Sequence, residues 1–358
     1  MMLNSILRTC AASALIAAFI TPVMADSGSV TVASFGGSYA ESQKKAFLAP
    51  FQQETGIKAN MVDYNGGLGE IRTQVETGNV SWDVVDVEMQ DLVRGCDDGL
   101  FEPVADIKLP AAADGTGAAS DFIEGTLHEC GVGTIIWSTV IAYNTEMFAG
   151  EKPTKMADFF DVEKFPGKRG LMKKPQAFLE WALIADGVES KDVYTVLATP
   201  EGVDRALAKL DTIRDNIVWW DAHAQAPQLL ADKEVAMTMA ANGRIYAAEV
   251  GEGKPFKTIW DNQIWVQEFW AILKGARNID AAKQYIAFAS RPEQMAVQAG
   301  MISYGPARKS AAATVDEAMR PHLPTNAENF ATAFHNDVEF WADHGDAISE
   351  RFNVWLNN

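Results

Sequence analysis

Two tryptophans and an aspartate stand together at the end of a short β-like run, as Trp219-Trp220-Asp221. The faces of indole rings attract organic cations, and a carboxylate beside them pairs with an ammonium group, so this trio suits an organic amine. Tryptophan pairs also pack cores and domain contacts, and for Trp219 that interpretation has equal weight. For Trp220 with Asp221 we favour a binding site, because strand ends of α/β domains collect ligands.

Two glutamates lie in or beside runs that are otherwise fit for burial. Glu88 follows the strand-like residues 82–87, and Glu268 interrupts the run QIWVQEFWAIL at residues 263–273. A carboxylate in such a place is costly unless it meets a partner or solvent. We therefore treat both as candidate ligand-binding carboxylates, with a cation of the protein or of the ligand as the partner of Glu268. Asp86 is interpreted as a structural cap.

A glycine turn follows the first β-rich run, residues 30–35, as Gly36-Gly37-Ser38. Ser38 with Glu41 has the spacing of a helix capping box. A strand, a glycine turn and a helix N-terminus expose backbone N–H groups that can hold an anion. The segment lacks both GxGxxG spacing and a P-loop lysine, so a nucleotide-binding fold is not supported.

Two long β-like runs are the elements that would position these residues. Residues 132–143 and 263–273 are each long enough to cross from one lobe to another. Trp137, in the first run, is a further candidate ligand-binding residue. A turn at Asp261-Asn262 is expected to separate the second run from residues 256–260.

Helices and short strands alternate along the rest of the chain. Another helix is expected to begin at Asn242-Gly243. The C-terminal part is expected to be helical. Its core face would carry Phe330, Phe334, Val338 and Trp341.

Length and charge narrow the class of protein. A chain of 358 residues predicts two domains. Residues 1–25 have a basic Arg8, an apolar stretch and a small-residue cleavage site, so we expect a signal peptide and export to the periplasm. Cys10 lacks a lipobox, so no lipid anchor is expected. Removal of Arg8 changes the formal net charge from −18 to −19. Nucleic acid is an improbable partner for so acidic a chain.

Two cysteines remain after export, Cys96 and Cys130. An even count in an oxidising compartment predicts one disulfide. Neither has the close Cys or His spacing that zinc needs, so no metal is expected. No other cofactor is expected, and we expect a monomer.

The chain resembles the spermidine/putrescine-binding family of type II periplasmic solute-binding proteins. The resemblance covers essentially the whole mature chain and rests on a combination of short motifs. They are ASFGGSY at residues 33–39, FQQETGI at 51–57, WDVVD at 82–86, CGVGT at 130–134, WWD at 219–221, MAANG at 239–243 and WAI at 270–272.

This resemblance implies two α/β lobes joined by two β crossovers, which close on a ligand and dock to an ABC permease. Residues 26–140 with 267–308 would form one lobe, and residues 141–266 with 309–358 the other. The family's ligand positions would fall on Gly36, Gly37, Tyr39, Glu88, Gln90, Glu268 and Tyr304.

Two departures from the family bear on the ligand. Polyamine binders carry carboxylates after the second lobe's first strand, where this chain has Lys173-Lys174, and a tryptophan where it has Ala241. The change favours a shorter amine, or one with a carboxylate at its other end, as in a γ-amino acid. Lys173, Arg244 or the amides of Gly37-Ser38 would then hold that carboxylate. Alternatively, both lysines point to solvent and the ligand is a polyamine.

Two other classes of function remain open. An exported enzyme is disfavoured, because the chain has no HExxH, no GxSxG and no tight nucleophile–base pattern. A sensory binding module on the same fold would need no permease. The five histidines are scattered and are assigned surface or structural roles; they are His128, His223, His322, His335 and His344.

Overall fold

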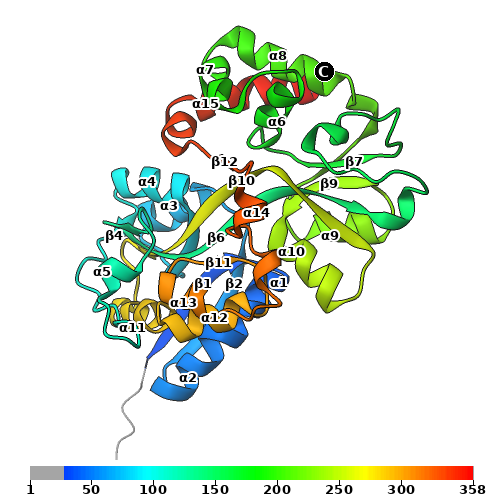
Figure 1. Cartoon of the computed structure of the whole chain (residues 1–358). Helices are drawn as coiled ribbons and strands as arrows, with labels where there is room; N and C mark the ends of the chain where they lie inside the picture. The colour runs from blue at the N-terminus through cyan, green and yellow to red at the C-terminus, as the bar shows by residue number, and fades with distance from the viewer. Residues whose placement is uncertain (1–27, 358) are drawn as a thin grey trace, which may run out of the picture.

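The computed structural model describes residues 28–357, so the expected signal peptide, residues 1–25, lies outside the described residues. The main path of the sheet runs β2-β1-β3-β10-β6-β9-β7-β8. Figure 1 shows two α/β lobes, with β6 and β10 running through both. This arrangement confirms the predicted architecture. Between residues 28 and 357 no helix has the length and apolar character needed to cross a membrane.

The two lobes are each built on parallel strands beside the antiparallel crossovers. β1 is parallel to β2 and β3, and β7 is parallel to β8 and β9. β10 pairs antiparallel with both β3 and β6. The strands are β1 (Ser29–Phe35), β2 (Lys58–Tyr64), β3 (Val84–Glu88), β4 (Phe101–Glu102), β5 (Leu127–His128), β6 (Gly131–Asn144), β7 (Arg169–Met172), β8 (Ile217–Trp220), β9 (Met237–Ala241), β10 (Phe256–Leu273), β11 (Gly305–Pro306) and β12 (Phe334–His335).

Helices pack against the strands of each lobe. In Figure 1, α11, α12 and α13 lie with β1 and β2 in one lobe, and α6, α7, α8 and α15 gather in the other. The α-helices are α1 (Ser38–Gln43), α2 (Ala49–Thr55), α3 (Gly69–Glu76), α4 (Met89–Asp97), α5 (Ala118–Asp121), α6 (Phe178–Ala185), α7 (Val193–Leu197), α8 (Pro200–Asp211), α9 (Gln225–Ala231), α10 (Asn242–Tyr246), α11 (Ile279–Ala289), α12 (Pro292–Ala299), α13 (Lys309–Thr314), α14 (Ala327–Phe330) and α15 (Val338–Asn357).

The apolar runs of the crossovers lie largely in the interior, and β10 is buried from Gln267 to Leu273. Every residue of β6 is buried. β10 is continuous from Phe256 to Leu273, so the turn predicted at Asp261-Asn262 is wrong. The register with β6 shifts between Ile259 and Ile264, where Asn262 has a φ of 54°. Pairing with β6 resumes at Ile264. A bulge of this kind accommodates turn-forming residues without ending the strand.

Alternating side chains of the first lobe's strands feed two separate cores. Trp270 and Ile272 belong to a core that contains Tyr285 of α11, whereas Phe269 belongs to a core that contains Leu92 of α4. The second lobe has one core, in which Trp220 is buried. The period of two in a strand places neighbouring residues on opposite faces of the sheet.

The first helix begins where expected but without the expected cap. Ser38 is the first residue of α1, and Gly37 is the N-cap residue with no side-chain hydrogen bond. The predicted Ser38–Glu41 capping box is therefore not formed. Its role passes to Gly37, whose φ of 72° turns the chain sharply into the helix.

The C-terminal part is less helical than predicted. Short elements, α13, α14 and β12, precede the long helix α15, and Phe330 is 39% exposed. The predicted helix is wrong between α14 and α15, where Phe334 and His335 form β12 and pair with β10. Trp341 is buried in the second lobe's core, as expected.

The predicted disulfide is confirmed. Cys96 of α4 and Cys130, just before β6, are bonded, with a Cα–Cα distance of 5.9 Å. The bond joins the helix that follows β3 to the start of the first crossover. It therefore fixes two elements that carry candidate site residues.

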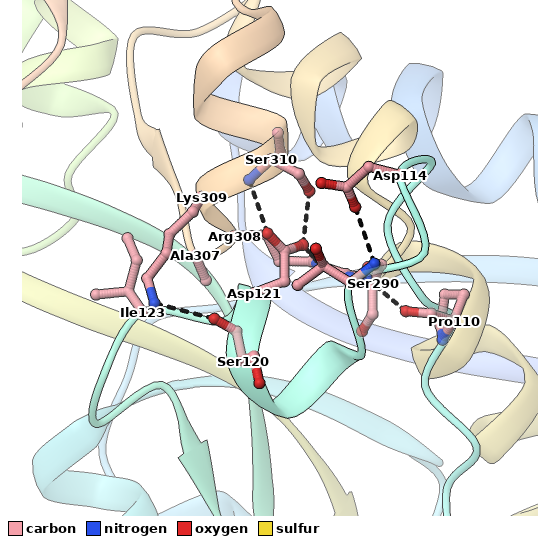
Figure 2. A network of polar contacts seen from close by, with 12 residues as sticks. Pro110, Asp114, Ser120, Asp121, Ile123, Ser290, Ala307, Arg308, Lys309 and Ser310 are labelled. Carbon is pink, nitrogen blue, oxygen red and sulfur yellow. Dashed lines mark hydrogen bonds and ion pairs between the residues drawn. The ribbon is translucent and has the colours of Figure 1, made fainter.

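A buried ion pair anchors the segment after β11 to the first lobe (Figure 2). The Nε of Arg308 donates to Asp121 Oδ2 over 2.6 Å, and its Nη1 donates to the carbonyls of Pro110 and Ser290. The backbone N–H and hydroxyl of Ser310 also donate to Asp121. Removing one partner of such a pair leaves a buried charge and costs about 3–5 kcal/mol. The network holds in place the stretch that carries Tyr304.

Candidate ligand-binding site

Asp86, near the end of β3, is held by three donors within the first lobe. Its Oδ2 accepts hydrogen bonds from Ser34 Oγ (3.0 Å), Tyr39 Oη (2.8 Å) and Gln43 Nε2 (2.6 Å). Its Oδ1 is buried and has no donor among the described residues. Burial raises the pKa of Asp86, and the three donors oppose this effect only in part. Asp86 is thus more than the cap that its position in the sequence indicated.

Glu268 of β10 faces the same region from the neighbouring strand. It stands directly opposite Glu88 of β3 in the register. Its Oε1 accepts a hydrogen bond from Trp137 Nε1 over 2.8 Å, and its Oε2 is buried without a donor. Burial raises the pKa of Glu268 well above its usual range, and the nearby carboxylates of Asp86 and Glu88 raise it further.

Asp86 and Glu268 behave as one carboxyl pair. The two groups lie within hydrogen-bonding reach of each other, and each has one oxygen without another donor. Two buried carboxylates so close together cannot both ionise easily, so they share a proton. The pair therefore carries about one negative charge and is poised to accept a cation.

A small aromatic cavity opens beside Glu268, between the two lobes. Its accessible space is about 10 Å³, which is room for about one water molecule. The rings of Tyr39 and Tyr304 meet edge to face, with centroids 5.2 Å apart. The lining residues are Phe35, Tyr39, Ile135, Trp137, His223, Ala241, Arg244, Glu268 and Tyr304.

Arg244 brings a positive charge to this cavity from the second lobe. It belongs to α10, is 4% exposed, and its Nη1 donates to the carbonyl oxygen of Gly36 over 2.6 Å. A Cβ atom at Gly37 would lie 2.7 Å from that Nη1, so the glycine makes room for the guanidinium. Among the described residues no carboxylate forms an ion pair with Arg244.

His223 is a cavity residue that the sequence did not reveal. Its ring packs against Phe35, Trp137 and Trp220, with centroids 6.2, 5.5 and 5.7 Å away. Burial lowers its pKa to about 3, and the charges of Arg244 and Lys174 contribute, so the imidazole is neutral near pH 7. Its position directly after WWDA was the available signal. Scattered spacing of the histidines hid it.

The residues Trp220, Asp221 and Lys173 lie outside the aromatic cavity. Trp220 is 2% exposed, in the second lobe's core, behind His223. Lys173 Nζ lies 3.5 Å from Asp221 Oδ2, and both side chains are exposed. This exposed pair lies beside a larger cleft, which Lys173 lines together with Lys174, Glu88 and Gln90. The ring of Trp219 packs on Phe352 and Trp355 of α15, so this tryptophan has the packing role that was the alternative to ligand binding.

Glu88 and Gln90 line a second, adjoining chamber. Gln90 Nε2 donates to Glu88 Oε2 over 3.1 Å. The chamber has about 60 Å³ of accessible space and shares Trp137 and His223 with the aromatic cavity. Burial raises the pKa of Glu88, and the charge of Lys174 counteracts part of that rise.

The remaining glycine-loop residues stand at the rim. Gly37 and Ser38 line a separate hollow, which they share with Arg244. Of the expected site residues, the structure gathers Tyr39, Trp137, Arg244, Glu268 and Tyr304 around the aromatic cavity.

Two α/β lobes around a small buried cavity, joined by two β crossovers, define a type II periplasmic binding protein. A model of the bacterial extracellular solute-binding protein family matches residues 46–325. The chain belongs to this family, whose members bind solutes. This confirms the family resemblance seen in the sequence at that level.

Three relatives show how far the similarity extends. A gamma-aminobutyric acid-binding protein from Pseudomonas aeruginosa is 44% identical over 338 residues, which cover 94% of each chain. A periplasmic binding protein from A. tumefaciens B6, solved in complex with glucopine, is 31% identical, with a TM-score of 0.83 over 91% of this chain and 99% of that one. A structure described as a GABA receptor is 32% identical, with a TM-score of 0.77 over 91% and 97%.

Solved spermidine/putrescine-binding proteins are more distant. Two of them are 16% and 17% identical to this chain, with TM-scores of 0.68 and 0.71. A likeness at that level shows the fold alone.

Proposed function

We propose that this protein is the periplasmic solute-binding component of an ABC importer and that it binds a γ-amino carboxylate such as γ-aminobutyrate. The observation that carries the proposal is the pair of opposite charges in one small cavity. Glu268 and Arg244 both line it, and neither has an ion-pair partner among the described residues. A buried charge needs a partner, so a ligand that brings both charges suits the site.

The ammonium group of the ligand would take the place of the proton between Asp86 and Glu268. The faces of Trp137, Tyr39 and Tyr304 would surround it and add cation–π attraction. The carboxylate of the ligand would pair with the guanidinium of Arg244, which can form two parallel hydrogen bonds. The ligand thus neutralises both the carboxyl pair and the arginine.

A long polyamine fits this cavity less well. The cavity is small, and its second charged group is a cation that repels an ammonium. The relatives support the same choice. The 44% identical protein is named a gamma-aminobutyric acid-binding protein, and one solved neighbour is described as a GABA receptor.

The lobes would open to admit the ligand and close around it. We assign residues 26–140 with 267–308 to the first lobe and residues 141–266 with 309–358 to the second. Arg244 of the second lobe already contacts Gly36 of the first, beside the cavity. A ligand that bridges Glu268 and Arg244 has its full affinity only for the closed state, and it shifts the population toward that state. The closed form would then dock to the permease.

Calorimetry on the refolded, ligand-stripped mature protein tests the proposal. The panel contains γ-aminobutyrate, putrescine, spermidine, a betaine, a neutral sugar and an aliphatic carboxylate. We expect γ-aminobutyrate to bind most tightly and Arg244→Met to weaken it more than tenfold. Arg291→Met, which removes a surface pair with Glu54, is the matched control and leaves affinity unchanged. Preference for putrescine or spermidine, or for the sugar, would contradict the assignment.

A further inference from the structure

The second chamber next to the aromatic cavity carries a carboxylate that the proposed ligand does not use. Glu88 lines this chamber, and Glu268 stands directly opposite it in the β3–β10 register. Residues opposite each other in an antiparallel pair have Cβ atoms about 5 Å apart. The chamber and the cavity share the walls formed by Trp137 and His223. A ligand with two ammonium groups would therefore find two carboxylates within reach of one short chain.

One cation of the protein acts on this second carboxylate. Lys174 follows β7 in the second lobe and lines the chamber opposite Glu88. A Cβ atom at Gly66, in the first lobe, would lie 3.5 Å from Lys174 Nζ, so the side chain reaches across the cleft. Its charge lowers the pKa of Glu88 and of Asp91, against the effect of burial on both.

The neighbouring lysine is different. Lys173 lies within 4 Å of Asp221 of its own lobe, and that pair is exposed. Lys174 forms no ion pair of that kind in the described part of the chain, residues 28–357. Its charge is therefore directed at the chamber and not neutralised locally.

We infer that Lys174 is a specificity-determining residue that excludes diamines. Its positive charge repels a second ammonium group from the position beside Glu88. The inference rests on the proposed function, because it assumes that the first ammonium group binds at Glu268. A monoamine with a carboxylate turns toward Arg244 and does not enter the chamber. An α,ω-diamine has to place its second charge between Glu88 and Lys174, where the lysine repels it. Such a repulsive element is a common means of discriminating between ligands that share one group.

The test compares two single substitutions that change the net charge equally. Putrescine and γ-aminobutyrate are titrated calorimetrically into ligand-stripped wild-type protein, Lys174→Met and the matched control Lys173→Met. We expect Lys174→Met to bind putrescine at least tenfold more tightly than Lys173→Met, with γ-aminobutyrate affinity changed by less than about threefold. Lys174→Gln serves as a second variant, and thermal unfolding verifies that each variant is folded.

A double substitution locates the effect. If the gain comes from Glu88, then Glu88→Gln in the Lys174→Met background abolishes it. Equal putrescine affinities for the Lys174 and Lys173 variants, including no binding by either, would overturn the inference. A wild-type protein that does not bind γ-aminobutyrate would overturn the proposed function instead, so the two failures are distinguishable.

Discussion

Replacing Glu268 by glutamine removes one charge from the centre of the site and keeps the size of the side chain. Oε1 of Glu268 accepts from Trp137, and Oε2 is the buried oxygen without a donor. We expect Oε2 to be the atom that receives the ammonium group of the ligand. A hydrogen bond to a charged group contributes about 1.5–3 kcal/mol. Since about 1.4 kcal/mol is tenfold in affinity, the loss is roughly 10- to 150-fold.

The structure places the expected value in the lower part of this range. Asp86 remains, held by the donors of Ser34, Tyr39 and Gln43, so it supplies part of the attraction. We expect the affinity for γ-aminobutyrate to fall about 10- to 50-fold, by the same conversion. The free energy of unfolding should not fall, because the substitution replaces a buried carboxyl group that has no ion-pair partner by a neutral amide.

Calorimetry gives the affinity, and thermal unfolding of the ligand-free protein gives the stability. Asp221→Asn is the matched control, since this exposed carboxylate pairs with Lys173 outside the cavity. Its affinity should stay within about twofold of the wild type. An unchanged affinity for Glu268→Gln, or an equal loss for Asp221→Asn, would refute the placement of the ammonium group.

Three other perturbations probe the same contacts. Burial raises the pKa of Glu268 in the free protein, and the ammonium group of the ligand replaces the shared proton, so binding should release protons. The affinity should therefore rise with pH until the pair is fully ionised. Titrations in buffers of different ionisation enthalpy measure the release, and proton uptake would contradict it. Gly37→Ala should weaken γ-aminobutyrate binding several-fold, because the new Cβ atom would meet the guanidinium of Arg244. Gly67→Ala is the control, since Gly67 also has a positive φ but a Cβ atom there meets nothing, and its calorimetric affinity should be unchanged. Equal effects of the two substitutions would argue against the Gly37–Arg244 contact. Replacing Cys96 and Cys130 by serine opens a loop of 34 residues and should lower the free energy of unfolding by ~4 kcal/mol. Denaturant titrations measure this loss. A loss below about 1 kcal/mol would show that the disulfide is not a major constraint on the unfolded chain.

Much of the fold could be predicted from the sequence because its strands are long and apolar. The two crossovers are visible as runs of apolar residues, and β6 is buried along its whole length. The turn predicted at Asp261-Asn262 failed because local turn chemistry cannot show that both flanks pair with the same partner strand. Tertiary pairing decided between a turn and a bulge.

The site was predictable in type but less so in membership. Glu268 was identified because an acid in a buried run needs a partner, and the structure places it in the cavity wall. Trp220 and Asp221 have equally suggestive chemistry, yet one is in the core and the other pairs with Lys173 at the surface. The direction of a side chain at a strand end depends on the neighbouring lobe, which the local sequence does not encode.

His223 and Lys174 show the same limit from the other side. His223 belongs to no motif, and Lys174 stood out only together with Lys173, as a departure from the family. The lobes bring each of them to the cleft from distant segments. Asp86 and Glu268 are also far apart in the chain, and they become diagonal neighbours because the register sets Glu268 opposite Glu88 and Trp270 opposite Asp86.

Recognition of both ends of a zwitterion by one cavity is the central claim. The most direct measurement is a calorimetric comparison of γ-aminobutyrate with butylamine, which lacks the carboxylate, and butyrate, which lacks the amine. We predict that γ-aminobutyrate binds at least 100-fold more tightly than either fragment, where each tenfold in affinity is about 1.4 kcal/mol. We also predict that Arg244→Met weakens the binding of γ-aminobutyrate and butyrate but not of butylamine. Butylamine binding as tightly as γ-aminobutyrate would contradict the claim, because Arg244 would then contribute nothing to recognition.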